Sequence, residues 1–200
     1  MRIDFAADDP DVNPYRLLTA VVVPRPIAWV STVSPTGVVN LAPHSFYTVA
    51  CARPPIVQFT SVGRKDTLRN ALATGEFVVN LAPAPLLEQV NNSSAAFPPD
   101  RSEVEALGID MEPSARVRPP RVSRSPVAIE CTVHSTNELG DSTVVLGNVV
   151  AISVDEEVLV DGHPEFARLD PLARLGRDQW ALHAELISLR RPARPDDIHP

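Results

Sequence analysis

The 200-residue sequence predicts a mainly β fold: a closed or partly closed barrel into which short helices are inserted. Several runs rich in Val, Ile and Thr have the length and composition of strands rather than of helices. The 21 prolines lie between these runs rather than in one tract, as expected for short strands joined by turns. The pattern shows no alternation of strands with helices, which disfavours a doubly wound parallel sheet.

The expected strands follow one another along the chain, at residues 20–33, 38–41, 46–50, 56–62, 77–81, 127–135, 143–158 and 180–189. Apolar and polar residues partly alternate in the stretches IECTVHS and AELISL, as a half-buried strand requires. The long run 143–158 is expected to bend or bulge near Gly147 or Asn148.

Three short helices are expected between the strands. The first begins near Thr67, carries its apolar residues on one face and ends at Gly75. The second has Pro85 in its first turn. The third is capped by Ser102 and ends at Gly108.

We expect one domain over residues 15–190, preceded by an N-terminal arm (1–14) and followed by a flexible tail (191–200). The formal net charge of −7 and the lack of a Lys/Arg cluster argue against a nucleic-acid partner. No apolar run reaches the roughly 18 residues of a membrane span, and the acidic N-terminus does not resemble a signal peptide. Two distant cysteines in apolar surroundings, Cys51 and Cys131, are typical of reduced thiols in a cytoplasmic protein.

Several common catalytic motifs are missing. The eight glycines form neither a dinucleotide-binding fingerprint nor a phosphate-binding P-loop, and no serine-hydrolase elbow is present. The histidines and cysteines show no metal-ligand spacing, so no metal is expected.

The segment Ser61–Thr67 is a candidate anion site, because a strand ends and a helix begins there. A helix start leaves backbone N–H groups unpaired and carries partial positive charge, which suits a phosphate. Arg64 and Lys65, the only lysine, precede the helix, Thr67 adds a hydroxyl donor, and Asp66 is expected to cap it. An ordinary capped helix with solvated basic neighbours is the alternative interpretation.

The segment Asn40–Tyr47 is a candidate site for a flat heterocycle. Pro43 is expected to break a long strand, freeing backbone groups at His44, Ser45 and Phe46 to bind a ring edge. The alternative is a hairpin corner with a core phenylalanine. In a third segment, Pro24–Thr32, Trp29 is either a ligand contact or a core residue.

Taken in order, these segments resemble the flavin reductase-like family, which includes flavoredoxin and small flavin reductases and binds FMN in a split β-barrel. The matching runs are RPIAWVST (25–32), GxxNLAPHSFY (37–47), RPPIV (53–57), RKDTxxN (64–70) and GEFVVN (75–80). The match covers mainly residues 15–82, with a weaker similarity in LARLGRDQW (172–180).

The resemblance implies a homodimer with one FMN per subunit near the dimer interface. It implies that Ser31 and Thr32 face the ribityl chain or its phosphate, and that Arg64, Lys65 and Thr67 hold the phosphate in a turn shaped by Asp66. The isoalloxazine edge would be bound, mainly through backbone groups, by Asn40, Ala42, Pro43, His44, Ser45, Phe46 and Tyr47. Trp29 completes the expected cofactor contacts.

The function that follows is an NAD(P)H-dependent flavin reductase, in which NAD(P)H binds transiently over the flavin because the chain has no dinucleotide motif. No catalytic side chain is identified, and His44 and His134 are the only candidates. An oxygenase or another electron acceptor is the expected partner. A flavoredoxin-like electron carrier without nicotinamide turnover and a non-enzymatic ligand-binding dimeric barrel are the alternatives.

Overall fold

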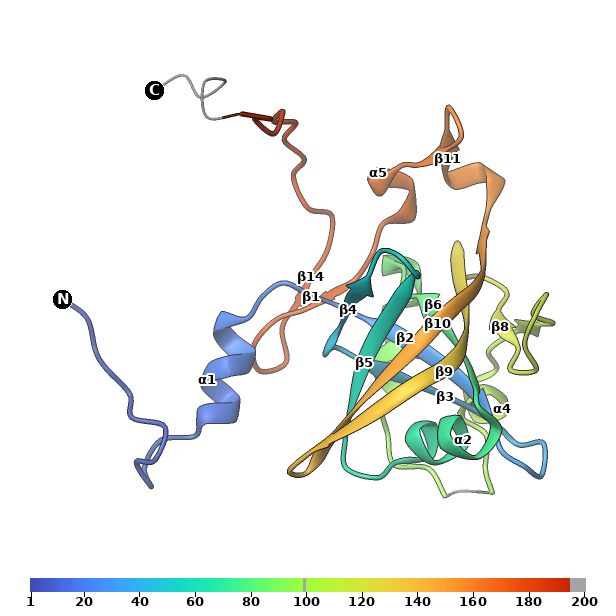
Figure 1. The fold of residues 1–200 in the computed structure, drawn as a ribbon, viewed down its shortest axis with the longest axis horizontal. Helices are drawn as coiled ribbons and strands as arrows, with labels where there is room; N and C mark the ends of the chain where they lie inside the picture. Colours follow the sequence, from blue (N-terminus) through green and yellow to red (C-terminus); the bar gives the residue numbers. More distant parts are fainter. Residues whose placement is uncertain (99, 195–200) are drawn as a thin grey trace.

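The structure, a computed structural model, describes residues 1–98 and 100–194 and confirms the mainly β architecture. Its centre is a seven-stranded antiparallel sheet with the strand order β3-β2-β6-β9-β10-β5-β4 (Figure 1). The strands are β2 (Ala28–Val33), β3 (Val39–His44), β4 (Tyr47–Cys51), β5 (Ile56–Val62), β6 (Glu76–Leu81), β9 (Val127–Leu139) and β10 (Ser142–Val154).

The sheet curls so that its two edge strands approach each other. Only Ser45 and Phe46 separate β3 from β4 along the chain, although these strands lie at opposite ends of the strand order. At this corner the Thr60 N–H of β5 donates to the Phe46 carbonyl at 2.9 Å. The expected break therefore falls after His44. Contrary to the prediction, β3 continues through Pro43, because an edge strand tolerates a residue without an N–H group.

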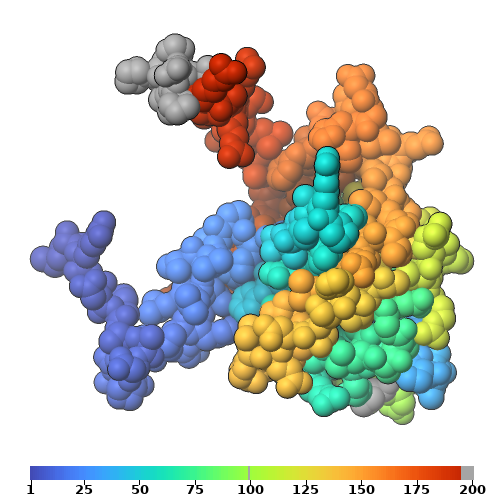
Figure 2. All heavy atoms as spheres, viewed as in Figure 1, coloured from blue at the N-terminus to red at the C-terminus, as the bar shows by residue number. Residues whose placement is uncertain are grey.

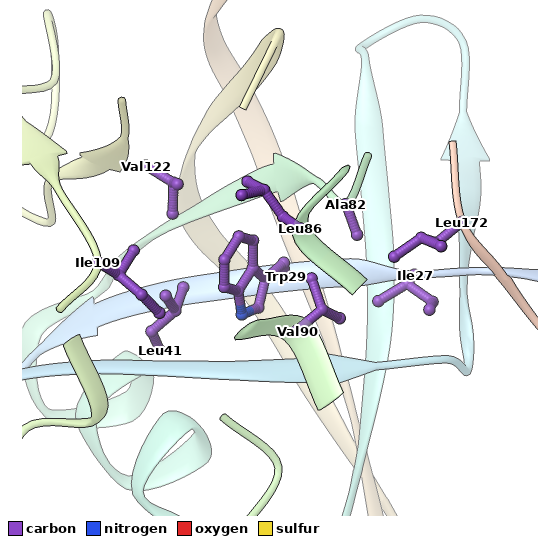
Figure 3. Close-up of a cluster of buried hydrophobic side chains, with 9 residues drawn as sticks. All are labelled: Ile27, Trp29, Leu41, Ala82, Leu86, Val90, Ile109, Val122 and Leu172. Atoms are coloured by element: carbon purple, nitrogen blue, oxygen red, sulfur yellow. The ribbon is translucent and has the colours of Figure 1, made fainter. Parts of the chain in front are cut away.

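The core has two layers that meet on β2. Val30 points into the barrel, where it belongs to a cluster with Phe59 and Phe77. Trp29 points to the opposite face and lies at the centre of a second cluster (Figure 3). Because helices and loops cover this outer face, both faces of β2 are buried and the strand shows little apolar–polar alternation.

The predicted irregularity in the longest hairpin is confirmed. The register between β9 and β10 shifts at Leu146/Gly147 and again between Val149 and Ala151. A Cβ atom on Gly147 would lie 2.3 Å from Cζ of Phe77, so the close approach of this ring requires glycine.

Short helices surround the barrel. They are α1 (Pro14–Val21), α2 (Asp66–Thr74), η1 (Ala84–Leu86), α3 (Leu87–Asn92), α4 (Glu103–Leu107), η2 (Glu156–Val158) and α5 (Phe166–Leu169). All three expected helices are present, and Gly75 and Gly108 end two of them in the left-handed conformation. Ser102 precedes α4 but does not cap it, because its hydroxyl donates to the Val39 carbonyl at 2.7 Å.

The remaining strands are two residues long. Three of them form one small sheet: β1 (Arg25–Pro26), β13 (Ala173–Arg174) and β14 (Trp180–Ala181). The other four form two antiparallel pairs, β7 (Met111–Glu112) with β8 (Arg121–Val122) and β11 (Leu159–Val160) with β12 (His163–Pro164).

Three expected strands are wrong in part. The expected strand 143–158 ends at Val154, and Glu156–Val158 form the 3-10 helix η2. Residues 20 and 21 end α1, which Asn13 caps by accepting the Arg16 N–H at 3.0 Å and in which Pro14 occupies the first turn. The expected strand 180–189 is limited to β14, because β13, its partner in the small sheet, is only two residues long. Residues 182–189 are exposed and in neither helix nor strand.

The ends of the described chain project from the barrel (Figure 2). Residues 1–11 are exposed, and α1 buries none of its side chains. Residues 195–200 of the expected tail lie outside the described residues. Within the described chain, no helix has the length and apolar character needed to cross a membrane.

Candidate functional site

A cavity of about 320 Å³ lies between β3 and the start of α2. We call it the β3–α2 cavity. A strand directs every second side chain to the same face, so β3 presents Asn40, Ala42 and His44 together. The opposite wall comes from residues 93–97 and Glu103. Seven of the predicted site residues line this cavity, namely Asn40, Ala42, Pro43, His44, Lys65, Asp66 and Thr67.

Hydrogen bonds fix the orientation of the buried Asn40 side chain. Its Oδ1 accepts from the hydroxyls of Thr67 at 2.8 Å and Thr32 at 3.2 Å. Its Nδ2 donates to Oε1 of Glu103 at 2.9 Å. Behind it, Nδ2 of Asn70 donates to Oγ1 of Thr32 at 3.2 Å. The network joins β2, β3, α2 and α4, and it makes the cavity floor a preformed surface.

His44 is the one buried group in the cavity wall with an unused nitrogen. Its Nδ1 lies 3.3 Å from the Thr60 carbonyl, and its ring packs 4.8 Å from that of Phe59. Only 8% of the residue is exposed, and Nε2 has no hydrogen-bond partner in the described chain. Burial lowers the pKa of His44 to about 4. At neutral pH the imidazole is therefore uncharged, and when Nδ1 donates to Thr60, Nε2 is a free acceptor.

The start of α2 differs from the prediction in one respect. Lys65, not Asp66, occupies the N-cap position, and no side chain caps the helix. Asp66 is the first helical residue, and its carboxylate forms an ion pair with Arg69 one turn later. The hydroxyl hydrogen of Thr67 is donated to Asn40. What α2 offers the cavity is therefore its first-turn backbone N–H groups and the exposed ammonium of Lys65.

Two other residues that were predicted to contact the ligand form hydrogen bonds with their side chains elsewhere in the protein. Trp29 is fully buried in the core, and its Nε1 donates to Ser93 Oγ at 2.9 Å. Ser31 is also fully buried, and its hydroxyl donates to the Pro120 carbonyl at 2.6 Å. Thr32 supports Asn40 from behind without lining the cavity, and Arg64 is exposed outside it.

The rest of the predicted loop lines adjoining cavities. Ser45 lies in a small cavity of about 170 Å³, which shares Pro43 and Ser94 with the β3–α2 cavity. Phe46 and Tyr47 line a largely apolar cavity of about 400 Å³ on the far side of Ser45. Burial raises the pKa of Tyr47 to about 12, so its hydroxyl stays protonated. His134, the other candidate, is exposed on β9.

Sequence reasoning missed Glu103, Arg69 and residues 93–97. Glu103 is visible only as an acidic residue in the first turn of a predicted helix, and nothing local shows that it meets β3. Within the described residues, no group of three or more His, Cys, Asp or Glu side chains is placed to hold a metal ion.

A family model described as "Flavin reductase like domain" matches residues 20–170. The chain belongs to the flavin reductase-like family. An uncharacterized protein of Halalkalibacterium halodurans, BH2278, is 40% identical over 190 residues, which cover 89% of this chain and 90% of that protein.

Two solved structures have the same fold as this flavin reductase-like chain. One is nitrilotriacetate monooxygenase component B from Bacillus cereus (TM-score 0.86, 29% identity, 94% of this chain and 100% of that chain covered). The other is the 2-nitrobenzoate 2-nitroreductase NbaA of Pseudomonas fluorescens (TM-score 0.85, 30% identity, 95% of this chain and 97% of that chain covered). The split barrel expected from the sequence is confirmed.

Proposed function

We propose that this protein binds FMN in the β3–α2 cavity and reduces it with NAD(P)H. Membership of the flavin reductase-like family supports a flavin cofactor and oxidoreductase activity. The choice of FMN, the nicotinamide donor and the residues that bind each of them are part of the proposal.

The start of α2 suits the phosphate of FMN. This phosphate carries nearly two negative charges, and the first-turn N–H groups with the ammonium of Lys65 supply donors and positive charge. Of the two carboxylates in the wall, Asp66 is paired with Arg69, and Glu103 accepts hydrogen bonds from Asn40 and Leu41. Neither carboxylate is left without a partner to repel an anion.

The observation that carries the proposal is that β3 and the start of α2 meet in one cavity, which is lined by seven of the residues expected to bind FMN. The uncharged imidazole of His44 forms part of its wall. Next to it, the backbone N–H groups of Ser45 and Phe46 donate no hydrogen bond within the described chain. They are free for the acceptor atoms on the edge of a flat heterocycle.

The chemistry that a bound flavin supplies is acceptance of hydride at N5. The protein's own contribution is to fix the phosphate at α2, to present donors at the β3–β4 corner and to keep one wall of the cavity apolar. None of these tasks requires an acid or base, so we assign no catalytic side chain, and His44 stays uncharged in the cavity wall.

The proposal includes a homodimer and an electron-accepting partner such as an oxygenase. Helix α1 buries none of its residues and leaves Leu18 and Val21 exposed, which supports a second copy covering it. The Bacillus cereus protein described above is component B of a monooxygenase, which supports an oxygenase as the partner that accepts the electrons.

The test is to purify the protein, record its absorption spectrum, titrate it with FMN and then follow oxidation of NADH and of NADPH. Tight FMN binding with nicotinamide oxidation is the expected result. Tight FMN binding without oxidation of NADH or NADPH would indicate an electron carrier instead of a reductase. No flavin binding, before or after incubation with FMN, would refute the proposal. Sedimentation equilibrium measures the oligomeric state independently.

A further inference from the structure

A second cavity of about 660 Å³ lies on the other side of Ser45 and gathers four arginines from separate parts of the chain. Arg16 comes from α1, Arg25 from β1, Arg174 from β13 and Arg177 from the turn that follows. Asp178 is the only carboxylate in its wall. The whole chain has a formal net charge of −7, so this basic lining is a local feature of what we call the arginine cavity.

Arg25 makes the cavity a built structure rather than a chance group of surface charges. Only 6% of the residue is exposed. Its guanidinium donates to the Thr19 and Val22 carbonyls of the α1 region, to the Leu175 carbonyl at 2.8 Å and to Ser45 Oγ at 3.4 Å. No carboxylate forms an ion pair with it in the described chain, so its positive charge is uncompensated inside the protein.

Of the other three arginines, one is held in place by its neighbours and two have guanidinium groups that are free to bind an anion. Arg174 lies over the Trp180 ring at 4.8 Å and donates to the Arg177 carbonyl at 2.7 Å, with Asp178 at 3.8 Å. The guanidinium groups of Arg16 and Arg177 form no ion pair or hydrogen bond in the described residues. Burial lowers the pKa of Arg25, the nearby Tyr15 opposes this shift, and the neighbouring charge of Arg174 adds to it.

The wall between α1 and the turn after β13 is closely packed. A Cβ atom on Gly176 would lie 3.0 Å from Cα of Ala20, so the two backbones nearly touch. Figure 1 shows α1 beside the segment that joins β13 to β14. This contact fixes the spacing between the arginines of α1 and those of the turn.

The arginine cavity lies near the proposed flavin site, and a small cavity lies between them. It shares Ser45 and Arg174 with the small cavity of about 170 Å³. That small cavity in turn shares Pro43 and Ser94 with the β3–α2 cavity. Ser45, whose backbone N–H donates no hydrogen bond in the described chain, therefore lies in the wall of the arginine cavity and beside the proposed flavin site.

We propose that the arginine cavity binds the phosphate groups of the nicotinamide dinucleotide that delivers hydride to the flavin, an assignment that rests on the function proposed above. Four cations against one carboxylate match the several negative charges of a diphosphate, whereas a monocarboxylate would neutralise only one. The site needs no glycine-rich fingerprint, because arginine side chains replace the backbone N–H groups that such a motif supplies.

The test uses the double variant Arg16→Gln/Arg177→Gln, because both residues are exposed and neither holds the fold together. The matched control is Arg116→Gln, another exposed arginine, which lines none of these cavities. Calorimetry measures the affinities for NAD⁺, NADP⁺, inorganic pyrophosphate, benzoate and FMN, on FMN-free and FMN-loaded protein, at low and high salt. We expect the double variant to bind the dinucleotides and pyrophosphate about tenfold or more weakly, with FMN affinity unchanged within about twofold.

Three results would overturn the assignment. The first is dinucleotide affinity that does not change in the double variant. The second is a parallel loss of FMN affinity, which would place the flavin phosphate among the arginines. The third is binding of benzoate without pyrophosphate, which would indicate an aromatic acid instead. Arginine-dependent dinucleotide binding by a protein that fails to bind FMN would refute the function proposed above and leave only the dinucleotide phosphate site standing.

Discussion

Glu103 accepts a hydrogen bond from the side-chain amide of Asn40, with Oε1 and Nδ2 2.9 Å apart. This bond decides which way the amide faces, because a carboxylate oxygen can only accept. The amide oxygen of Asn40 is thereby turned toward the hydroxyls of Thr67 and Thr32. The helix α4, which contributes little else to the site, thus sets the orientation of a residue on β3.

Replacing Glu103 should therefore cost stability. Glu103→Ala leaves two buried donors without an acceptor, Nδ2 of Asn40 and the N–H of Leu41, which lies 3.1 Å from Oε2. We expect the free energy of unfolding to fall by about 2–4 kcal/mol in urea denaturation. The exposed Glu105→Ala on the same helix should change it by less than about 0.5 kcal/mol. Equal effects of the two variants would show that the bonds to β3 contribute nothing.

Lys65 and Arg64 are adjacent cations, but only Lys65 lines the β3–α2 cavity. Lys65→Ala should weaken FMN binding by about 1–3 kcal/mol, because a charge-assisted bond to the phosphate is lost, and the melting temperature should not change. Arg64→Ala is the matched control and should bind FMN nearly as well as the parent. Fluorescence titration of FMN measures both, and a larger effect at Arg64 would contradict the placement of the phosphate.

His44 should make the protein less stable in mild acid. Its pKa is about 4 in the folded protein against an ordinary value of 6.5, so between these values the unfolded chain binds a proton that the native protein does not. Stability is then lost as the pH falls from 6.5 to 4, at about 1.4 kcal/mol per pH unit. Between pH 7 and pH 5 the parent should lose roughly 2 kcal/mol more than His44→Gln in urea unfolding. The exposed His134→Gln should follow the parent, and a His44→Gln profile identical to the parent's would show that this histidine is not buried in its neutral form.

Trp29 should contribute to the stability of the fold and should not contact the flavin. Trp29→Ala removes the central ring of the outer core cluster, and we expect a loss of about 3–5 kcal/mol in the free energy of unfolding. Leu189→Ala, at a residue 91% exposed, is the control and should be nearly neutral. Thermal melting checks both. Unchanged melting with altered fluorescence of bound FMN would instead place the indole against the cofactor.

The fold could be predicted from composition and local pattern because strands and helix ends leave local signals. Gly75 and Gly108 end helices where only a left-handed residue fits, and the hairpin irregularity falls at Gly147 as expected. The error at residues 20 and 21 arose because the strand-like valines at positions 21–23 hid the Asn13-Pro14 start of α1. The strand expected after Trp180 is limited by the two-residue length of its partner, which no local pattern reveals.

The site was predictable where one segment supplies it and not where distant segments meet. The cavity residues of β3 form one short run of the sequence and those at the start of α2 form another, so the chemistry of each run could be recognised there. Whether Ser31 faces the cavity or Pro120 depends on which side of β2 is covered, and that is a tertiary property. The arginines of the second cavity are separated by up to about 160 residues, and only the fold brings them together.

Strand β3 lies at an edge of the sheet, yet it offers almost nothing to a strand from another molecule. The Val39 carbonyl already accepts from Ser102, the Leu41 N–H donates to Glu103, and Pro43 has no N–H to donate. An edge occupied in this way resists the intermolecular pairing that leads to aggregation. The protein can thus leave this edge of its sheet without a neighbouring strand and still limit pairing with other molecules.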